Sequence, residues 1–204
     1  MMPLVKICGL TDRISVMVAV DAGADAIGFV FAESVRRVSA QHAAGISAHV
    51  PQRVKKVAVM MHPSNDEWQK VRTSFQPDVL QTDLADFDYL EVPEGIEKWP
   101  VMREGAMPAG DALPEIFVYE GRASGSGETV NWQLAAQLAK RGKMILAGGL
   151  SIANVPAAIK QVAPFGVDVS SGVESAPGKK ESTRIQAFIN AVRAAGSAIE
   201  EEKV

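Results

Sequence analysis

Cysteine is nearly missing from this chain of 204 residues, in which Cys8 is the single example. One cysteine excludes an intrachain disulfide framework and favours a reducing compartment. No apolar run approaches the roughly 20 residues that a membrane-spanning helix needs. The first residues also lack the apolar core of a signal peptide. We therefore expect a cytoplasmic protein without a membrane partner.

An excess of charge of one sign is also missing. The formal net charge is −3, and acidic and basic residues are interspersed. Without a basic stripe, nucleic acid is not an expected partner. The three histidines, His42, His49 and His62, show no spacing typical of metal ligands, so no metal is expected.

Short apolar runs alternate along the chain with amphipathic stretches. Strands are expected over residues 5–9, 26–31, 54–61, 78–81, 96–103, 115–119, 143–147 and 166–169. Helices are expected over residues 12–22, 39–49, 64–75, 131–141, 151–162 and 182–195. Such alternation is typical of parallel βαβ units. Eight strands in a chain of this length predict an α/β fold, a single (β/α)8 TIM barrel.

The barrel is expected to form one domain over residues 1–204, with 197–204 as a frayed C-terminal tail. An open, doubly wound sheet is the alternative architecture. A sheet of that kind that binds a dinucleotide carries G-x-G-x-x-G after its first strand, and this chain does not.

The carboxyl ends of the strands in a barrel meet at one mouth, where active sites lie. Polar, charged and small residues stand at these positions in the predicted strands and in the loops that follow them. They are Lys6, Cys8, Arg36, Gln81, Asp83, Glu120, Gly148, Gly149, Asp168, Ser170, Ser171 and Gly172.

The turns after the seventh and eighth strands, Gly148–Gly149 and Ser170–Gly172, are rich in glycine and serine. Small residues at this end of a barrel let backbone N–H groups approach a phosphate. Both segments predict phosphate binding, although tight turns alone have the same composition. The segment 124–127, Ser-Gly-Ser-Gly, could add further donors or act as a lid.

Cys8 and Glu120 could form an acid–base pair across the mouth. A neighbouring cation favours the thiolate of a cysteine, and Lys6 or Arg36 could supply the charge. Lys6 lies two residues before Cys8, so both side chains point to the same side of the strand. The alternatives are a cysteine that only fills the core and a Glu120 that pairs with Arg122 at the rim.

Arginine could hold a substrate carboxylate at this mouth. The planar guanidinium of Arg36 matches a carboxylate in a two-point contact. Arg37, beside it, is expected to be an ordinary surface charge.

Seven segments of the sequence, taken together, resemble the phosphoribosylanthranilate isomerases, which are barrels of tryptophan biosynthesis. The matching segments are 6–10 (Lys-Ile-Cys-Gly-Leu), 23–31, 34–39, 124–132, 146–150, 167–174 (Val-Asp-Val-Ser-Ser-Gly-Val-Glu) and 177–180. The resemblance runs nearly from end to end. It implies an isomerase that needs no cofactor and acts on a small phosphorylated substrate. Small barrels occur both as monomers and as dimers, so the chain is expected to be a monomer or a homodimer.

The resemblance also implies roles for single residues. Cys8 matches the general base of the family, and Arg36 matches the arginine that holds the anthranilate carboxylate. Asp168 matches an aspartate near the anthranilate ring. The phosphate-binding backbone of the family matches Gly148, Gly149, Ser170, Ser171 and Gly172. Lys6 and Gln81 are the further residues that we expect at the substrate.

The chain departs from the family pattern at two strand ends. The general acid is usually an aspartate after the sixth strand, where this chain has Glu120, with Tyr119 as the alternative one residue earlier. The fourth strand of the family commonly ends in Gln-Leu-His-Gly, whereas this chain has Gln-Thr-Asp-Leu at 81–84. An isomerase of histidine biosynthesis and a barrel that binds phosphate without turnover are the alternative functions.

Overall fold

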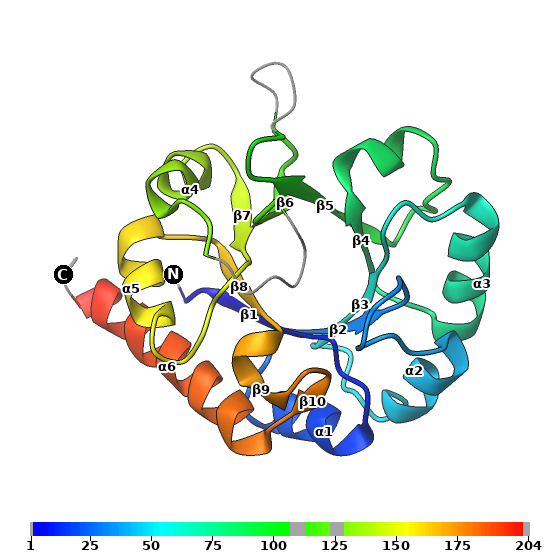
Figure 1. The fold of residues 1–204 in the computed structure, drawn as a ribbon, viewed down its shortest axis with the longest axis horizontal. Coiled ribbons are helices and arrows are strands. Elements are labelled where there is room, and N and C mark those ends of the chain that lie inside the picture. Colours follow the sequence, from blue (N-terminus) through cyan, green and yellow to red (C-terminus); the bar gives the residue numbers. More distant parts are fainter. Residues whose placement is uncertain (1, 107–112, 123–128, 202–204) are drawn as a thin grey trace.

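The computed structural model describes residues 2–106, 113–122 and 129–201. Eight parallel strands follow one another around a closed barrel in chain order, which confirms the predicted fold (Figure 1). The strands are β1 (Leu4–Cys8), β2 (Ala26–Val30), β3 (Lys55–Val59), β4 (Val79–Asp83), β5 (Glu97–Arg103), β6 (Ile116–Glu120), β7 (Lys143–Leu146) and β8 (Gly166–Val169).

Six α-helices surround the strands in the part of the chain that the structure describes (Figure 1). They are α1 (Arg13–Asp21), α2 (Ala40–Ile46), α3 (Asn65–Phe75), α4 (Trp132–Ala139), α5 (Val155–Val162) and α6 (Ser182–Glu201). Single-turn 3₁₀ helices, η1 (Leu84–Asp88) and η2 (Ser171–Val173), follow β4 and β8, and β9 (Glu174–Ala176) pairs with β10 (Lys179–Lys180) in a hairpin. Within the described ranges, no helix is long and apolar enough to cross a membrane.

Side chains on each strand alternate between the barrel interior and the layer under the helices. The interior is filled by a cluster to which most strands contribute: Ala26, Val57, Val79, Trp99, Val101, Val118, Ile145 and Ala147. The intervening residues, such as Ile27, Leu80 and Phe117, belong to the larger core that packs against the helices. This alternation decides which strand-end side chains face the mouth.

Helix α5 begins later than its sequence predicts. A helix capped by Ser151 was expected, but α5 starts at Val155. The backbone N–H of Ser151 instead donates to Asn154 Oδ1 at 2.8 Å, and Asn154 Nδ2 donates to the Gly149 carbonyl at 2.9 Å. Pro156 fits the first helical turn because it has no N–H to satisfy there. The turn before α5 therefore braces Gly149 rather than extending the helix.

Helix α6 continues to Glu201, past the predicted end at Ala195. The apolar face carries on at helical spacing from Val192 to Ile199, which packs against the core. A Cβ at Gly196 would lie 2.8 Å from Pro3 Cδ, so this glycine allows close contact with the N-terminal segment. Residues 197–201 thus belong to α6, and 202–204 lie outside the described residues.

Candidate active site

A cavity of about 350 Å³ lies at the carboxyl ends of the barrel strands. Its size suits a small organic ligand. Most of the predicted site residues line it together: Cys8, Arg36, Gln81, Glu120, Gly148, Gly149, Asp168, Ser170 and Ser171. Residues from six strands and the loops after them therefore meet at one site, although they lie far apart in the sequence.

Lys6 and Gly172 do not line this cavity. Lys6 is fully buried one layer deeper in the barrel, because it precedes Cys8 by two residues on β1. Gly172 packs against the neighbouring loop, where an added Cβ would lie 2.0 Å from the Leu150 carbonyl oxygen. Both residues lie behind the residues that line the cavity.

Cys8, Lys6 and Asp168 form a buried polar group on the strands β1 and β8. Lys6 and Asp168 are register partners on these strands, and Lys6 Nζ donates to Asp168 Oδ2 at 2.7 Å. The charge of Lys6 also acts on the thiol of Cys8. Gly28 on β2 makes room for the group, since a Cβ there would lie 3.0 Å from Cys8 Sγ and 3.1 Å from Lys6 Cε.

The net effect of these surroundings is to raise the pKa of the Cys8 thiol. Burial is the largest cause, because it disfavours the charged thiolate. Lys6 lowers the pKa, but Asp168 cancels part of that effect. The sequence predicted a cation beside Cys8 and did not predict the carboxylate that neutralises it. Burial and the Asp168 carboxylate therefore favour the thiol form of Cys8 over the thiolate.

Arg36 is fixed by a carboxylate that the sequence left without a role. Its Nε and Nη2 donate to the two oxygens of Glu174 at 2.7 and 2.8 Å. The buried Lys180 also donates to Glu174 at 2.7 Å and to the Ser170 carbonyl at 2.9 Å. Gly9, with φ at +71°, lets the Arg36 stem pass, because a Cβ there would lie 2.6 Å from Arg36 Cδ. The guanidinium is held at the cavity wall with donors to spare.

Glu120 rather than Tyr119 faces the cavity at the end of β6. Val118 belongs to the barrel interior, so Glu120, two residues later, points the same way. Tyr119 is fully buried under the helices, and burial raises its pKa to about 12. This geometry removes Tyr119 as an alternative acid, and Glu120 forms an ion pair with Arg103.

Arg103 is a cavity residue that the sequence did not single out. It ends β5 two residues after the interior Val101, so strand alternation could have revealed that it faces the mouth. Its Nη2 lies 2.8 Å from Asp83 Oδ1, while Nη1 contacts Glu120. One guanidinium thus joins the fourth, fifth and sixth strand ends.

Two buried polar atoms on residues that line the cavity lack a hydrogen-bond partner among the described residues. They are Gln81 Oε1 and Asp168 Oδ1. Gln81 is 4% exposed and Asp168 8%. Buried polar atoms are normally paired, so both favour a ligand that donates hydrogen bonds to them.

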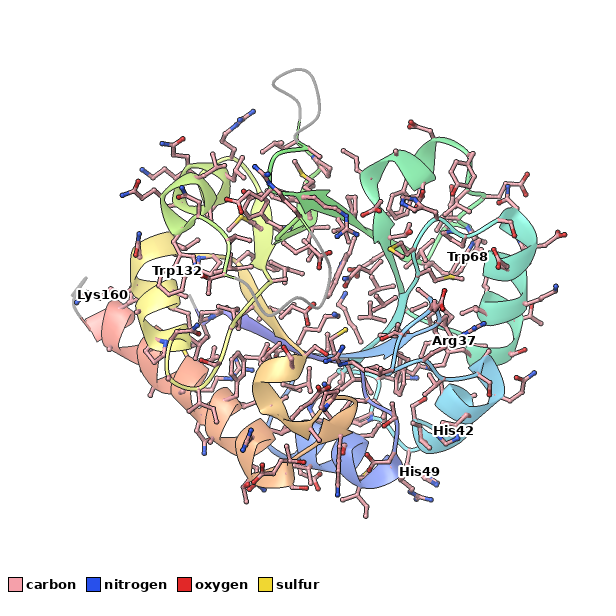
Figure 2. All side chains as sticks on the ribbon, viewed as in Figure 1. Arg37, His42, His49, Trp68, Trp132 and Lys160 are labelled. Carbon is pink, nitrogen blue, oxygen red and sulfur yellow. The ribbon has the colours of Figure 1, made fainter. Side chains whose placement is uncertain are left out.

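Several other residues considered from the sequence lie away from this centre. Arg37, His42 and His49, labelled in Figure 2, are exposed, and none of them lines the cavity. His62 lies near Asp83 and Asp86, with ligand-type atoms within 4.8 Å of one another. The oxygens of Asp86 already accept hydrogen bonds, from Thr82, Tyr89 and His62. This group is therefore a hydrogen-bond network.

The sequence model of N-(5'-phosphoribosyl)anthranilate isomerase matches residues 5–191 of the chain. Proteins of that name from Listeria innocua and Streptococcus gordonii are 37% and 39% identical to it. The alignments cover 95% and 94% of this chain, and 99% and 98% of the relatives. The chain belongs to the phosphoribosylanthranilate isomerase family.

Solved structures of phosphoribosylanthranilate isomerases share the fold. One, in complex with reduced 1-(o-carboxyphenylamino)-1-deoxyribulose 5-phosphate, has a TM-score of 0.76 and 30% identity, covering 95% of this chain and all of the other. A protein from Jonesia denitrificans has a TM-score of 0.79 and 32% identity, covering 95% and 98% of the two chains.

Proposed function

We propose that this chain converts N-(5-phosphoribosyl)anthranilate to 1-(2-carboxyphenylamino)-1-deoxyribulose 5-phosphate, an Amadori rearrangement in tryptophan biosynthesis. The observation that carries the proposal is that Cys8 and Glu120, a potential base and a potential acid, line the same cavity as Arg36 and two small-residue turns. Membership of the isomerase family supports it.

The proposed chemistry consists of proton transfers. Glu120 protonates the ring oxygen of the ribose, and the ring opens to a Schiff base. Cys8, once ionised, removes the proton at C2. The resulting enolamine then tautomerises to the ketone. Positioned acids and bases each contribute on the order of 10²–10⁴-fold, and no step needs a redox group or a metal.

Two sets of residues suit the two ends of the substrate. Arg36, fixed by Glu174, suits the anthranilate carboxylate, and the neighbouring Asp168 can accept a hydrogen bond through its unpaired Oδ1. At the other end, Gly148 and Gly149 have positive φ values of 87° and 59° and line the cavity with Ser170 and Ser171. Such turns can direct backbone N–H groups at a phosphate.

The assay that tests the proposal follows the loss of anthranilate-ribose fluorescence when the purified protein meets freshly prepared N-(5-phosphoribosyl)anthranilate. We expect turnover by the wild type and its loss in Cys8→Ala, in which the base is removed. Absence of turnover by a folded wild type would contradict the proposal. The two-phosphate aldose of histidine biosynthesis, assayed in parallel, shows whether a second substrate is accepted.

We further propose that the chain acts in the cytoplasm as one barrel domain, either as a monomer or as a homodimer. A solved relative from Thermotoga maritima is described as monomers of a dimeric phosphoribosylanthranilate isomerase. Sedimentation equilibrium of the full chain distinguishes the two forms.

A further inference from the structure

An ion-pair chain crosses three neighbouring strands at the cavity wall. Arg103 and Glu120 are register partners on β5 and β6, and Asp83 ends the adjacent β4. Arg103 Nη2 lies 2.8 Å from Asp83 Oδ1, and its Nη1 donates to Glu120 Oε1. The three side chains are 14–20% exposed. Partial burial makes such pairs stronger than pairs on the open surface.

Asp83 is itself held from the side away from Arg103. His62 Nε2 lies 3.1 Å from Asp83 Oδ2, and His62 Nδ1 lies 2.9 Å from Asp86 Oδ1. Asp86 is 2% exposed and accepts further hydrogen bonds from Thr82 and Tyr89. The chain of contacts therefore runs from a buried carboxylate in the barrel wall to the Glu120 side chain.

Glu120 needs such support more than an aspartate would. A glutamate side chain has one more rotatable bond than an aspartate side chain, so more freedom must be lost to hold its carboxyl group in one place. The planar fork of an arginine can restrain two carboxylates at once. The Asp83–Arg103 pair thus stands where it can compensate for the longer acid.

The charge of Arg103 is shared between the two carboxylates. Asp83 offsets part of the positive charge of Arg103. When Glu120 gives up its proton to the substrate, the carboxylate forms beside a guanidinium that is already in position.

We propose that Arg103, oriented by Asp83, is the positioning residue that aims Glu120 at the substrate. The proposal rests on the assignment of Glu120 as the general acid. Arg103 acts through Glu120 and Asp83 acts through Arg103. The three strand-end residues Asp83, Arg103 and Glu120 therefore form one arrangement.

The test measures kcat and KM for N-(5-phosphoribosyl)anthranilate in wild type, Arg103→Met, Arg103→Lys, Asp83→Asn and the double variant Asp83→Asn/Arg103→Met. Glu120→Gln is the reference for loss of the acid. Arg37→Met, which removes an exposed arginine outside the cavity, is the matched control (Figure 2). Thermal unfolding of each protein checks that it is folded.

We expect Arg103→Met to lower kcat by about 10–100-fold with KM changed less than about threefold, as for lost support of a catalytic group. Arg103→Lys recovers part of the loss, because an ammonium can pair with one carboxylate but lacks the fork. Asp83→Asn lowers kcat by a smaller factor in the presence of Arg103 and has no further effect in the Arg103→Met background.

A wild-type kcat in Arg103→Met, beside an inactive Glu120→Gln, would overturn the positioning role and leave the acid in place. A rise in KM without a fall in kcat would also overturn it, since Arg103 would then bind substrate. Equal effects of Asp83→Asn in both backgrounds would show that Asp83 does not act through Arg103. A fully active Glu120→Gln would refute the acid assignment itself. If Arg103→Met does not fold, Arg103→Lys and Asp83→Asn decide the outcome.

Discussion

Replacing Glu174 by glutamine tests how the site holds Arg36. Burial of the Glu174 carboxyl would raise its pKa, but hydrogen bonds and attraction from Arg36 and Lys180 outweigh burial and lower the pKa to about 2. Against the ordinary value of 4.5, this shift corresponds to about 3 kcal/mol of stability at neutral pH. Glutamine keeps the shape and removes the charge, so this contribution is lost in Glu174→Gln.

The stability that Glu174→Gln loses depends on pH in a definite direction. The carboxyl of Glu174 takes up a proton at a lower pH in the folded protein than in the unfolded chain, so its contribution is present above pH 4.5. It declines as the pH falls towards 2, with a limiting slope of about 1.4 kcal/mol per pH unit. The difference in stability between wild type and Glu174→Gln should shrink accordingly in acid.

Urea unfolding at a series of pH values between 3 and 7 measures this difference. Glu115→Gln is the matched control, because Glu115 pairs with Lys143 but its side chain is 82% exposed, and we expect its effect to be small. A difference between wild type and Glu174→Gln that stays constant with pH would refute the reasoning. Glu174→Gln should also raise KM, since glutamine offers Arg36 one acceptor oxygen in place of the two carboxylate oxygens that hold the guanidinium.

Three further predictions concern the reacting group and the acid. Gly28→Ala should lower kcat and cost about 1–3 kcal/mol of stability, because its Cβ would lie 3.0 Å from Cys8 Sγ. Kinetics and urea unfolding measure these two effects. The control Gly45→Ala, with open space around its Cβ, should remain fully active. The rate of Cys8 alkylation by iodoacetamide should rise with pH, and the midpoint of the rise should lie above that of an ordinary cysteine, about 8.5. The reason is that burial raises the pKa of the Cys8 thiol. A midpoint below that of an ordinary cysteine would contradict this prediction. Tyr119→Phe should keep wild-type kcat, since the phenol is buried away from the cavity, and an inactive variant would restore Tyr119 as the acid.

The order of strands and helices was predictable because each element carries its own local signal. The helices predicted over 12–22, 39–49 and 64–75 are present, and their first predicted residues, Asp12, Ser39 and Ser64, are the N-caps. The mouth followed from topology, since parallel strands bring their carboxyl ends together. The predicted start of α5 was wrong, because the sequence alone did not show that the Asn154 side chain accepts a hydrogen bond from the Ser151 backbone.

Contacts between distant loops were beyond the reach of local patterns. Arg36 and Glu174 are 138 residues apart, and their pairing depends on how the loops after β2 and β8 pack. The Arg103–Glu120 pair depends on the register between β5 and β6, which no spacing in the sequence reveals. The alternation of side chains along a strand predicted that Lys6 and Cys8 point to the same side of β1, but it did not predict that Lys6 is fully buried.

The central claim is that Cys8 and Glu120 perform the two proton transfers. The most direct measurement determines two quantities in wild type, Cys8→Ala and Glu120→Gln. One is kcat, and the other is the affinity for the reduced analogue of the product 1-(2-carboxyphenylamino)-1-deoxyribulose 5-phosphate. Each substitution should lower kcat by at least about 10²-fold while analogue affinity changes little. Wild-type kcat in either variant, or loss of analogue binding in proportion to the loss of kcat, would contradict the account.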